Sequence, residues 1–96
     1  MLKNYSNPVI AKQNAKEYLG NDVRLYLSTR KDKKYMVLND NGKYIHFGQI
    51  GYEDFTKHKD LKRRDAYLKR ATKIKGNWKS DKYSPNNLSI NILWKL

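Results

Sequence analysis

Two histidines and two aspartates lie close together in the middle of the chain, at His46, Asp54, His58 and Asp60. Imidazole and carboxylate groups bind divalent metals, and either can act as a general base, which raises the possibility of a metal-dependent nuclease. Their spacing matches neither a zinc signature nor an HNH-type nuclease motif, and His58 and Asp60 adjoin lysines. We therefore expect a hydrogen-bond network that orders this segment, with no metal, no other cofactor and no catalysis.

A strongly basic segment follows, KHKDLKRRDAYLKRATKIK at residues 57–75, with nine of the chain's 21 lysines and arginines and two acids. In an α-helix these side chains would separate onto two arcs. The cationic arc holds Lys62, Arg63, Lys69, Arg70 and Lys73, and the apolar arc holds Leu61, Tyr67, Leu68, Ala71 and Ile74. Such a helix docks by its apolar side and presents its cations to an anionic polymer, for which nucleic acid is the leading candidate.

A second basic cluster lies in a predicted connection between strands, at Arg30, Lys31, Lys33 and Lys34. If this connection and the basic helix share one side of the domain, they form a single surface that can contact successive phosphates of a nucleic-acid backbone. Lysine and arginine bind phosphates through Coulomb attraction and counterion release, so the affinity would tolerate different sequences and fall with salt.

The aromatic residues offer a further way to contact nucleic acid, because unpaired bases stack on aromatic rings. In a domain of this size we expect most of them to lie in the core or to cover it, and we assign Trp78 a structural role. The residues concerned are Tyr26, Tyr35, Tyr44, Tyr52, Trp78 and Tyr83.

Arg64 differs from its neighbours because its angular position falls inside the apolar arc of the helix. A charge placed there needs a partner. The nearest carboxylates outside the helix are Glu53 and Asp54, so we expect Arg64 to be substantially buried and to tie the preceding loop to the helix.

The elements that would position these residues follow from caps and periodicity. Asn7-Pro8 and Gly20 bound an amphipathic helix at 8–19. Period-two patterns from Val23 to Phe47 predict a three-stranded antiparallel meander, with a tight type I′ turn at Asn41-Gly42. Residues 48–57 are predicted to form an ordered loop. Asp60 or Thr56 caps the basic helix and Gly76 ends it.

The last segment carries conflicting signals. Ser84-Pro85 favours a short helix, which we prefer, whereas Ile90, Ile92, Trp94 and Leu96 alternate as in a strand. Its apolar residues must either complete the core or dock onto a partner. The predicted fold is α+β: a meander covered by an N-terminal helix, the long basic helix and a short C-terminal helix.

The length and composition indicate the broad class of protein. The 96 residues suit one domain spanning 1–96, with a formal net charge of +12. The chain has no cysteine, no apolar run long enough to span a membrane and no apolar core typical of a signal peptide, so we expect it neither to bind membranes nor to be secreted.

The segments HFGQIGYEDFTKHKDLKRRDAYLKR, KGNW and YSPNNLSINILW, together with VRLYLSTRKDKKYMV, carry a family resemblance. From about Tyr18 to Trp94, the chain resembles uncharacterised small basic proteins encoded by large nucleocytoplasmic DNA viruses, the phycodnaviruses and mimivirus relatives. The resemblance implies a viral protein in the cytoplasm or nucleus of an infected cell, packaged with the genome or built into the virion. It brings no known activity or catalytic residues.

Three interpretations result. The favoured one is non-catalytic binding of nucleic acid, DNA rather than RNA. The alternative is a minor structural component of the virion or capsid whose basic face binds an acidic surface of another virion protein. A metal-dependent nuclease comes third.

Overall fold

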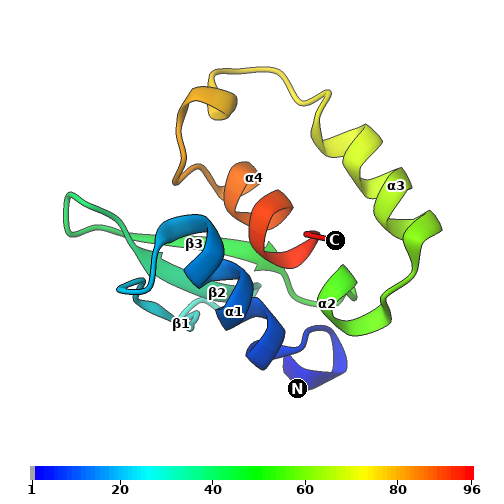
Figure 1. Ribbon diagram of the computed structural model, residues 1–96, viewed down its shortest axis with the longest axis horizontal. Helices are drawn as coiled ribbons and strands as arrows, with labels where there is room; N and C mark the ends of the chain where they lie inside the picture. The colour runs from blue at the N-terminus through cyan, green and yellow to red at the C-terminus, as the bar shows by residue number, and fades with distance from the viewer. Residues whose placement is uncertain (1) are drawn as a thin grey trace.

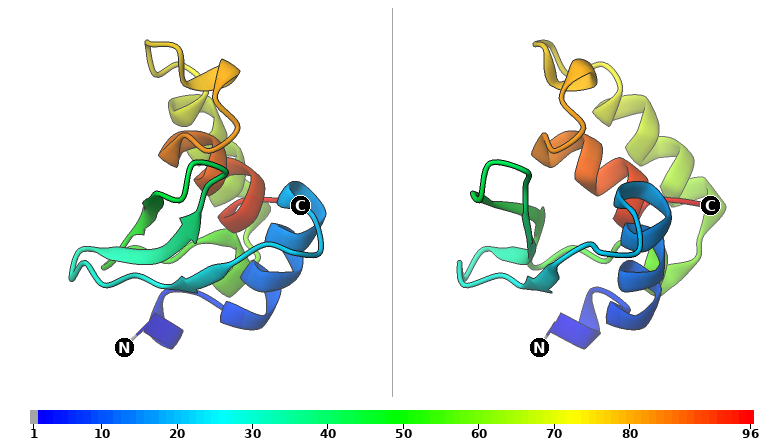
Figure 2. Two further views of the ribbon diagram at one scale, coloured as in Figure 1. Left: turned by 90° about the vertical axis from the view of Figure 1, so that its left-hand side faces the viewer. Right: turned by 60° about the vertical axis from the view of Figure 1, so that its left-hand side comes forward.

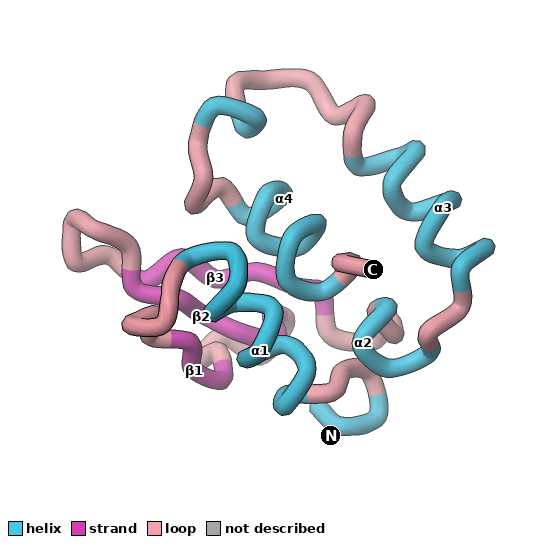
Figure 3. Tube along the Cα trace, viewed as in Figure 1, coloured by secondary structure: helices cyan, strands magenta, loops and turns pink. Residues whose placement is uncertain are grey.

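The computed structural model describes residues 2–96 and has the predicted α+β architecture, drawn in Figure 1 and by element type in Figure 3. The helices are α1 (Pro8–Leu19), α2 (Phe55–His58), α3 (Leu61–Ala71) and α4 (Pro85–Leu88). The strands are β1 (Leu25–Leu27), β2 (Lys33–Leu38) and β3 (Tyr44–Gln49). Two short 3₁₀ helices, η1 (Leu2–Asn4) and η2 (Trp78–Ser80), and a π-helical turn, η3 (Ser89–Leu93), complete the described chain.

Helix α1 has the bounds that its end signals predict. The side chain of Asn7 accepts hydrogen bonds from the amides of Val9 and Ile10, at 3.1 and 3.3 Å. Pro8 occupies the first turn, where its missing amide donor costs nothing. Gly20 follows the helix with φ of 105°, a conformation that glycine adopts readily.

The three strands form an antiparallel sheet in the order β1-β2-β3, as the meander prediction required. Tyr35 of β2 lies opposite Phe47 of β3. The predicted type I′ turn is wrong, because Gly42 has positive φ and Asn41 does not. The amide of Gly42 instead donates to the carbonyl of Asn39 at 3.1 Å, and the side chain of Asn39 accepts from the amides of Asn41 and Lys43.

The core lies between the sheet, α1 and the C-terminal helical segment formed by α4 and η3. Its buried members are Tyr35, Val37 and Phe47 from the sheet, Ala11 and Ala15 from α1, and Leu88, Ile92 and Leu93 from the C-terminal segment. In Figures 1 and 2 the C-terminal segment lies between the sheet and α3. It thus completes the core of this domain, which decides between the two roles predicted for it.

The C-terminal segment is helical, as its cap indicates, and the alternative strand pattern is wrong. The hydroxyl of Ser84 accepts from the amide of Asn87 at 3.2 Å at the start of α4. The amide of Trp94 donates to the carbonyl of Ser89 at 3.1 Å, which closes the wider turn of η3. This turn places Ile92 and Leu93 in the core together with Leu88.

Two predicted boundaries in the middle of the chain need correction. Residues 48–57 are not loop throughout, because Gln49 ends β3 and Asp54 caps the short helix α2. Helix α3 starts after Asp60 as predicted but ends at Ala71 instead of continuing to Gly76. Asn86 donates to the carbonyl of Ala71 at 3.0 Å and so satisfies an acceptor at this end of α3.

No helix within residues 2–96 combines the length and the apolar character needed to cross a bilayer.

Candidate nucleic-acid interface

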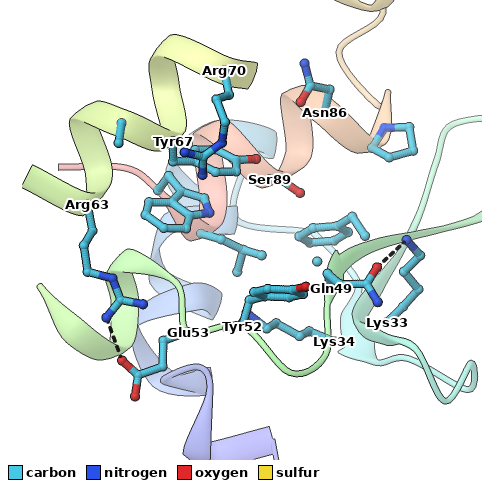
Figure 4. Close-up of a pocket in the computed structure, with 16 residues that line it drawn as sticks. Lys33, Lys34, Gln49, Tyr52, Glu53, Arg63, Tyr67, Arg70, Asn86 and Ser89 are labelled. Carbon is cyan, nitrogen blue, oxygen red and sulfur yellow. Dashed lines mark hydrogen bonds and ion pairs between the residues drawn. The ribbon is translucent and has the colours of Figure 1, made fainter. Parts of the chain in front are cut away.

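A cleft of about 600 Å³ separates α3 from the end of β3 and the loop that follows it. The C-terminal segment forms its back wall, and Figure 4 shows the side chains that line it. The polar and charged lining residues are Lys33, Lys34, Gln49, Glu53, Arg63, Arg70, Asn86 and Ser89. The other lining residues are Phe47, Gly48, Tyr52, Ala66, Tyr67, Pro85, Leu93 and Trp94.

Helix α3 contributes one stripe of side chains to this cleft. Arg63, Ala66, Tyr67 and Arg70 follow the i, i+3, i+4, i+7 spacing that aligns side chains along one face of a helix. Asp60 caps the helix by accepting from the amide of Lys62 at 2.9 Å. Two of the five cations predicted on this helix therefore face the cleft, and both are arginines.

Apart from Arg64, which is half-buried, the remaining cations of the basic segment are also exposed. Lys69 pairs with Asp65 at 3.4 Å, and both side chains are about 70% exposed, so the pair leaves the lysine available to another anion. Lys62 lies in the first turn of α3, whereas Lys73 lies in the turn after the helix has ended. The predicted cationic arc is thus confirmed as a solvent-facing group, with Lys73 outside the helix. The predicted apolar arc is wrong at Leu61 and Ile74, which are exposed.

The rim of the cleft carries charges of both signs. At one end, Arg63 and Glu53 form an ion pair with an N···O distance of 3.2 Å. On the sheet side, the ammonium group of Lys33 donates to the side-chain carbonyl of Gln49 at 3.5 Å. Arg70 has no carboxylate within ion-pair distance among residues 2–96. The parts of the rim near Arg70 and Lys33 are therefore those where positive charge is least neutralised among the described residues.

Aromatic rings form much of the wall. Tyr67 and Trp94 stack in parallel, with ring centroids 4.1 Å apart and an interplanar angle of 6°. Tyr52 is 71% exposed, and Figure 4 shows its ring between the side chains of Glu53 and Gln49. A large aromatic ring left in water is available to stack against a ligand.

Lys34 is not a surface cation, which corrects its assignment to the basic cluster. Its ammonium group lies 3.1 Å from a carboxylate oxygen of Asp54, and the two side chains are 3% and 1% exposed. It also donates to the backbone carbonyl of Tyr52 at 2.6 Å. Burial lowers the pKa of Lys34, although the neighbouring Asp54 opposes that change. Although Lys34 lines the cleft, its ammonium group is buried and already paired, so its role is structural.

A buried polar network extends from this ion pair to the N-terminus. Asp54 accepts from the amide of Thr56 at 3.0 Å, and the hydroxyls of Thr56 and Ser6 lie 3.1 Å apart. Ser6 shares a second hydrogen bond of 2.7 Å with the phenol of Tyr35. Burial raises the pKa of Tyr35 to about 12. Apart from the structural role predicted for Asp54, this network could not be predicted from the sequence, because most of its members are far apart along the chain.

Arg64 faces inward as predicted, but it is half-buried instead of substantially buried, and the predicted carboxylate partners are wrong. Its Nε donates to the backbone carbonyl of Trp94 at 2.7 Å, and its guanidinium carbon lies 5.7 Å from the centre of the Phe55 ring. Glu53 pairs with Arg63 instead. Arg64 thus connects α3 to the C-terminus and to α2.

The two histidines have local hydrogen-bond partners. Nδ1 of His46 lies 2.7 Å from the hydroxyl of Ser28, and Nδ1 of His58 accepts from the amide of Asp60 at 2.9 Å. Nε2 of His58 is buried without a partner in residues 2–96, next to the ring of Trp94. Burial, followed by the charge of Arg63, lowers the pKa of His58. Within the same residues, no three histidine, cysteine or acidic side chains come together to hold a metal ion.

The remaining predicted positions lie at the ends of elements. Arg30 and Lys31 are exposed in the turn that leads into β2, and Lys33 opens that strand at the rim of the cleft. Trp78 is half-buried, and its indole nitrogen donates to the carbonyl of Ile74 at 2.6 Å. Its own carbonyl accepts from Ser84 and Asn87, which agrees with a structural role.

Residues 23–71 match a known protein family, described as a family of unknown function (DUF5754). The chain belongs to this family. The matched segment covers the sheet, α2 and α3, and so includes the stripe of α3 and the sheet side of the cleft. No curated protein and no solved structure matches the chain.

Proposed function

We propose that this protein binds nucleic acid, DNA in preference to RNA, without catalysing a reaction on it. The observation that carries the proposal is the position of the α3 stripe: Arg63 and Arg70 lie on the rim of an aromatic-lined cleft, beside the other exposed cations of the basic segment. A formal charge of +12 on 96 residues adds long-range attraction for a polyanion.

The arrangement of cations supports contact with phosphates in particular. Arg70 has no ion-pair partner in the described chain, and the pairs of Arg63 and Lys69 are exposed to solvent. Exposed ion pairs contribute about 0–1 kcal/mol, so a phosphate can replace the carboxylate at little cost. Guanidinium groups also match phosphate oxygens in a bidentate geometry.

The setting that we propose is an infected cell. The resemblance to small basic proteins of large DNA viruses supports a role on the viral genome, in the cytoplasm or nucleus or within the particle. Such a role needs sequence-tolerant affinity, which contact with phosphates provides.

The proposal can be tested by titrating fluorescein-labelled duplex DNA with the protein over a series of salt concentrations. The logarithm of the association constant should fall linearly with the logarithm of the salt concentration, by about 0.9 for each phosphate neutralised. The double variant Lys62→Glu/Arg70→Glu should make that slope shallower by about 1.8, because it removes two phosphate contacts.

A matched control is available on α1, whose Lys12 and Lys16 are exposed and do not line the cleft. The variant Lys12→Glu/Lys16→Glu lowers the formal net charge of +12 by the same amount. It should weaken binding less and leave the slope closer to that of the unchanged protein. Equal slopes for the two double variants would show that net charge alone attracts the DNA and would remove α3 from the interface.

A further inference from the structure

We infer that the cleft holds an unpaired nucleotide of a single strand, with the base stacked on Tyr52 and the two flanking phosphates near Arg70 on one side of the cleft and near Lys33 on the other. This inference rests on the proposed function and specifies the form of nucleic acid that the protein prefers. A duplex keeps its bases paired, so it could contact the outer cations but could not place a base in the cleft.

The size and lining of the cleft fit one nucleotide. Its volume of about 600 Å³ lies in the range of roughly 300–1,000 Å³ typical of pockets that enclose small ligands. Tyr52 is the most exposed aromatic ring in its lining, with 71% of its surface in water. Tyr67 is less available, because one of its faces already stacks on Trp94. Tyr52 is therefore the ring on which a base can stack.

The charges along the rim give the nucleotide an orientation. Glu53 stands at the Arg63 end of the cleft and would repel a phosphate there unless Arg63 were drawn away from it. Lys33 hydrogen-bonds to the neutral amide of Gln49 and Arg70 has no carboxylate partner in the described chain, so their charges are free to attract an anion. The flanking phosphates therefore belong beside Arg70 and beside Lys33, and not beside Glu53.

A strand fits this site better than a free nucleotide. Lys33 joins the rim of the cleft directly to Arg30 and Lys31 in the preceding turn, and Lys69 lies next to Arg70 on α3. These exposed cations would have no partner on a single free nucleotide. They are suited to the phosphates that lead into and out of the cleft.

The test compares a single-stranded oligothymidylate carrying one central 2-aminopurine with a blunt duplex of equal length and with AMP. The protein should bind the single strand more tightly than the duplex and should quench the 2-aminopurine fluorescence through stacking. Tyr52→Ala should weaken binding of the single strand by about 5- to 150-fold, which corresponds to the loss of one base–aromatic stack, and should abolish the quenching. Duplex affinity should change less than twofold.

Two variants separate stacking from other effects. Tyr52→Trp should keep both affinity and quenching, because it retains an aromatic ring and the backbone carbonyl that Lys34 contacts. Tyr44→Ala removes another exposed tyrosine, one that does not line the cleft, and should leave both readouts unchanged. Equal losses in Tyr52→Ala and Tyr44→Ala would overturn the assignment of the cleft.

Failure of this inference differs from failure of the proposed function. Equal, salt-dependent binding of single strand and duplex with no effect of Tyr52→Ala would leave phosphate binding intact and refute the base site. Binding of AMP as tight as that of the oligonucleotide would refute a strand as the occupant. Absence of binding to any of the three would refute both proposals.

Discussion

The buried ion pair between Lys34 and Asp54 offers a sharp test of the structure, because the adjacent Glu53 forms an exposed pair. Asp54→Asn keeps the shape of the side chain and its hydrogen bond to the amide of Thr56, but it leaves the charge of Lys34 without a counterion. Glu53→Gln makes the same chemical change one residue earlier, where the side chains of the pair are 50% and 38% exposed. The two substitutions therefore differ mainly in burial.

The expected magnitudes follow from that difference. Removing one partner of a buried ion pair costs about 3–5 kcal/mol, whereas an exposed pair contributes about 0–1 kcal/mol. For a domain of this size, 1 kcal/mol moves the melting temperature by about 4–8 °C. Asp54→Asn should thus lower the melting temperature by at least about 12 °C, and Glu53→Gln should lower it by less than about 8 °C.

Thermal unfolding followed by far-ultraviolet circular dichroism measures both variants under identical conditions. The double variant Lys34→Met/Asp54→Asn should recover much of the lost stability, because no unpaired charge remains in the interior. Melting temperatures for Asp54→Asn and Glu53→Gln that agree within error would refute the reasoning. A folded Lys34→Met protein whose DNA affinity depends less steeply on salt would also refute the reasoning, because that result would place Lys34 among the phosphate contacts.

Two further predictions concern other contacts. Arg64→Ala should lower the free energy of unfolding by about 1–3 kcal/mol, because it removes a charged hydrogen bond to the carbonyl of Trp94. Arg63→Ala should lower it by less than about 1 kcal/mol, because its ion pair is exposed. Urea unfolding of the two variants measures this difference, and equal midpoints would contradict the inward position of Arg64. Tyr35 ionises near pH 10 in the unfolded chain but at about 12 in the fold, so its contribution to stability is present below pH 10 and falls by up to roughly 3 kcal/mol as the pH rises to 12. Urea unfolding from pH 9 to 12 should show that loss, and Tyr35→Phe should reduce it; the same pH dependence in both proteins would exclude Tyr35 as its source.

Local signals along the chain determined the elements well. The N-caps at Asn7, Asp60 and Ser84 were predicted correctly, because a cap depends on hydrogen bonds to amides two or three residues away. The meander was also predictable, since the alternation of side chains sets the strands. Helix α3 ended earlier than predicted where Asn86, distant in sequence, bonds to its last turn.

The environments of individual charged residues were harder to predict from the sequence. On α3, the angular position of Arg64 correctly distinguished it from Arg63, because position around a helix follows from spacing alone. It could not name the backbone carbonyl of Trp94 as the partner, which lies thirty residues further along the chain. Lys33 and Lys34 are adjacent, chemically identical and both line the cleft, yet only the ammonium group of Lys34 is buried, where it pairs with Asp54.

The cleft itself depends entirely on tertiary structure. The sequence identified Arg63, Arg70 and Lys33 as cations and Tyr52 as an aromatic residue. Their positions around one cleft depend on how α3 packs against the C-terminal segment and how that segment packs against the sheet. Spacing along a chain determines which side chains share the face of one helix or strand. Which faces meet depends on how separate elements bury their apolar surfaces together, and that is a property of the whole fold.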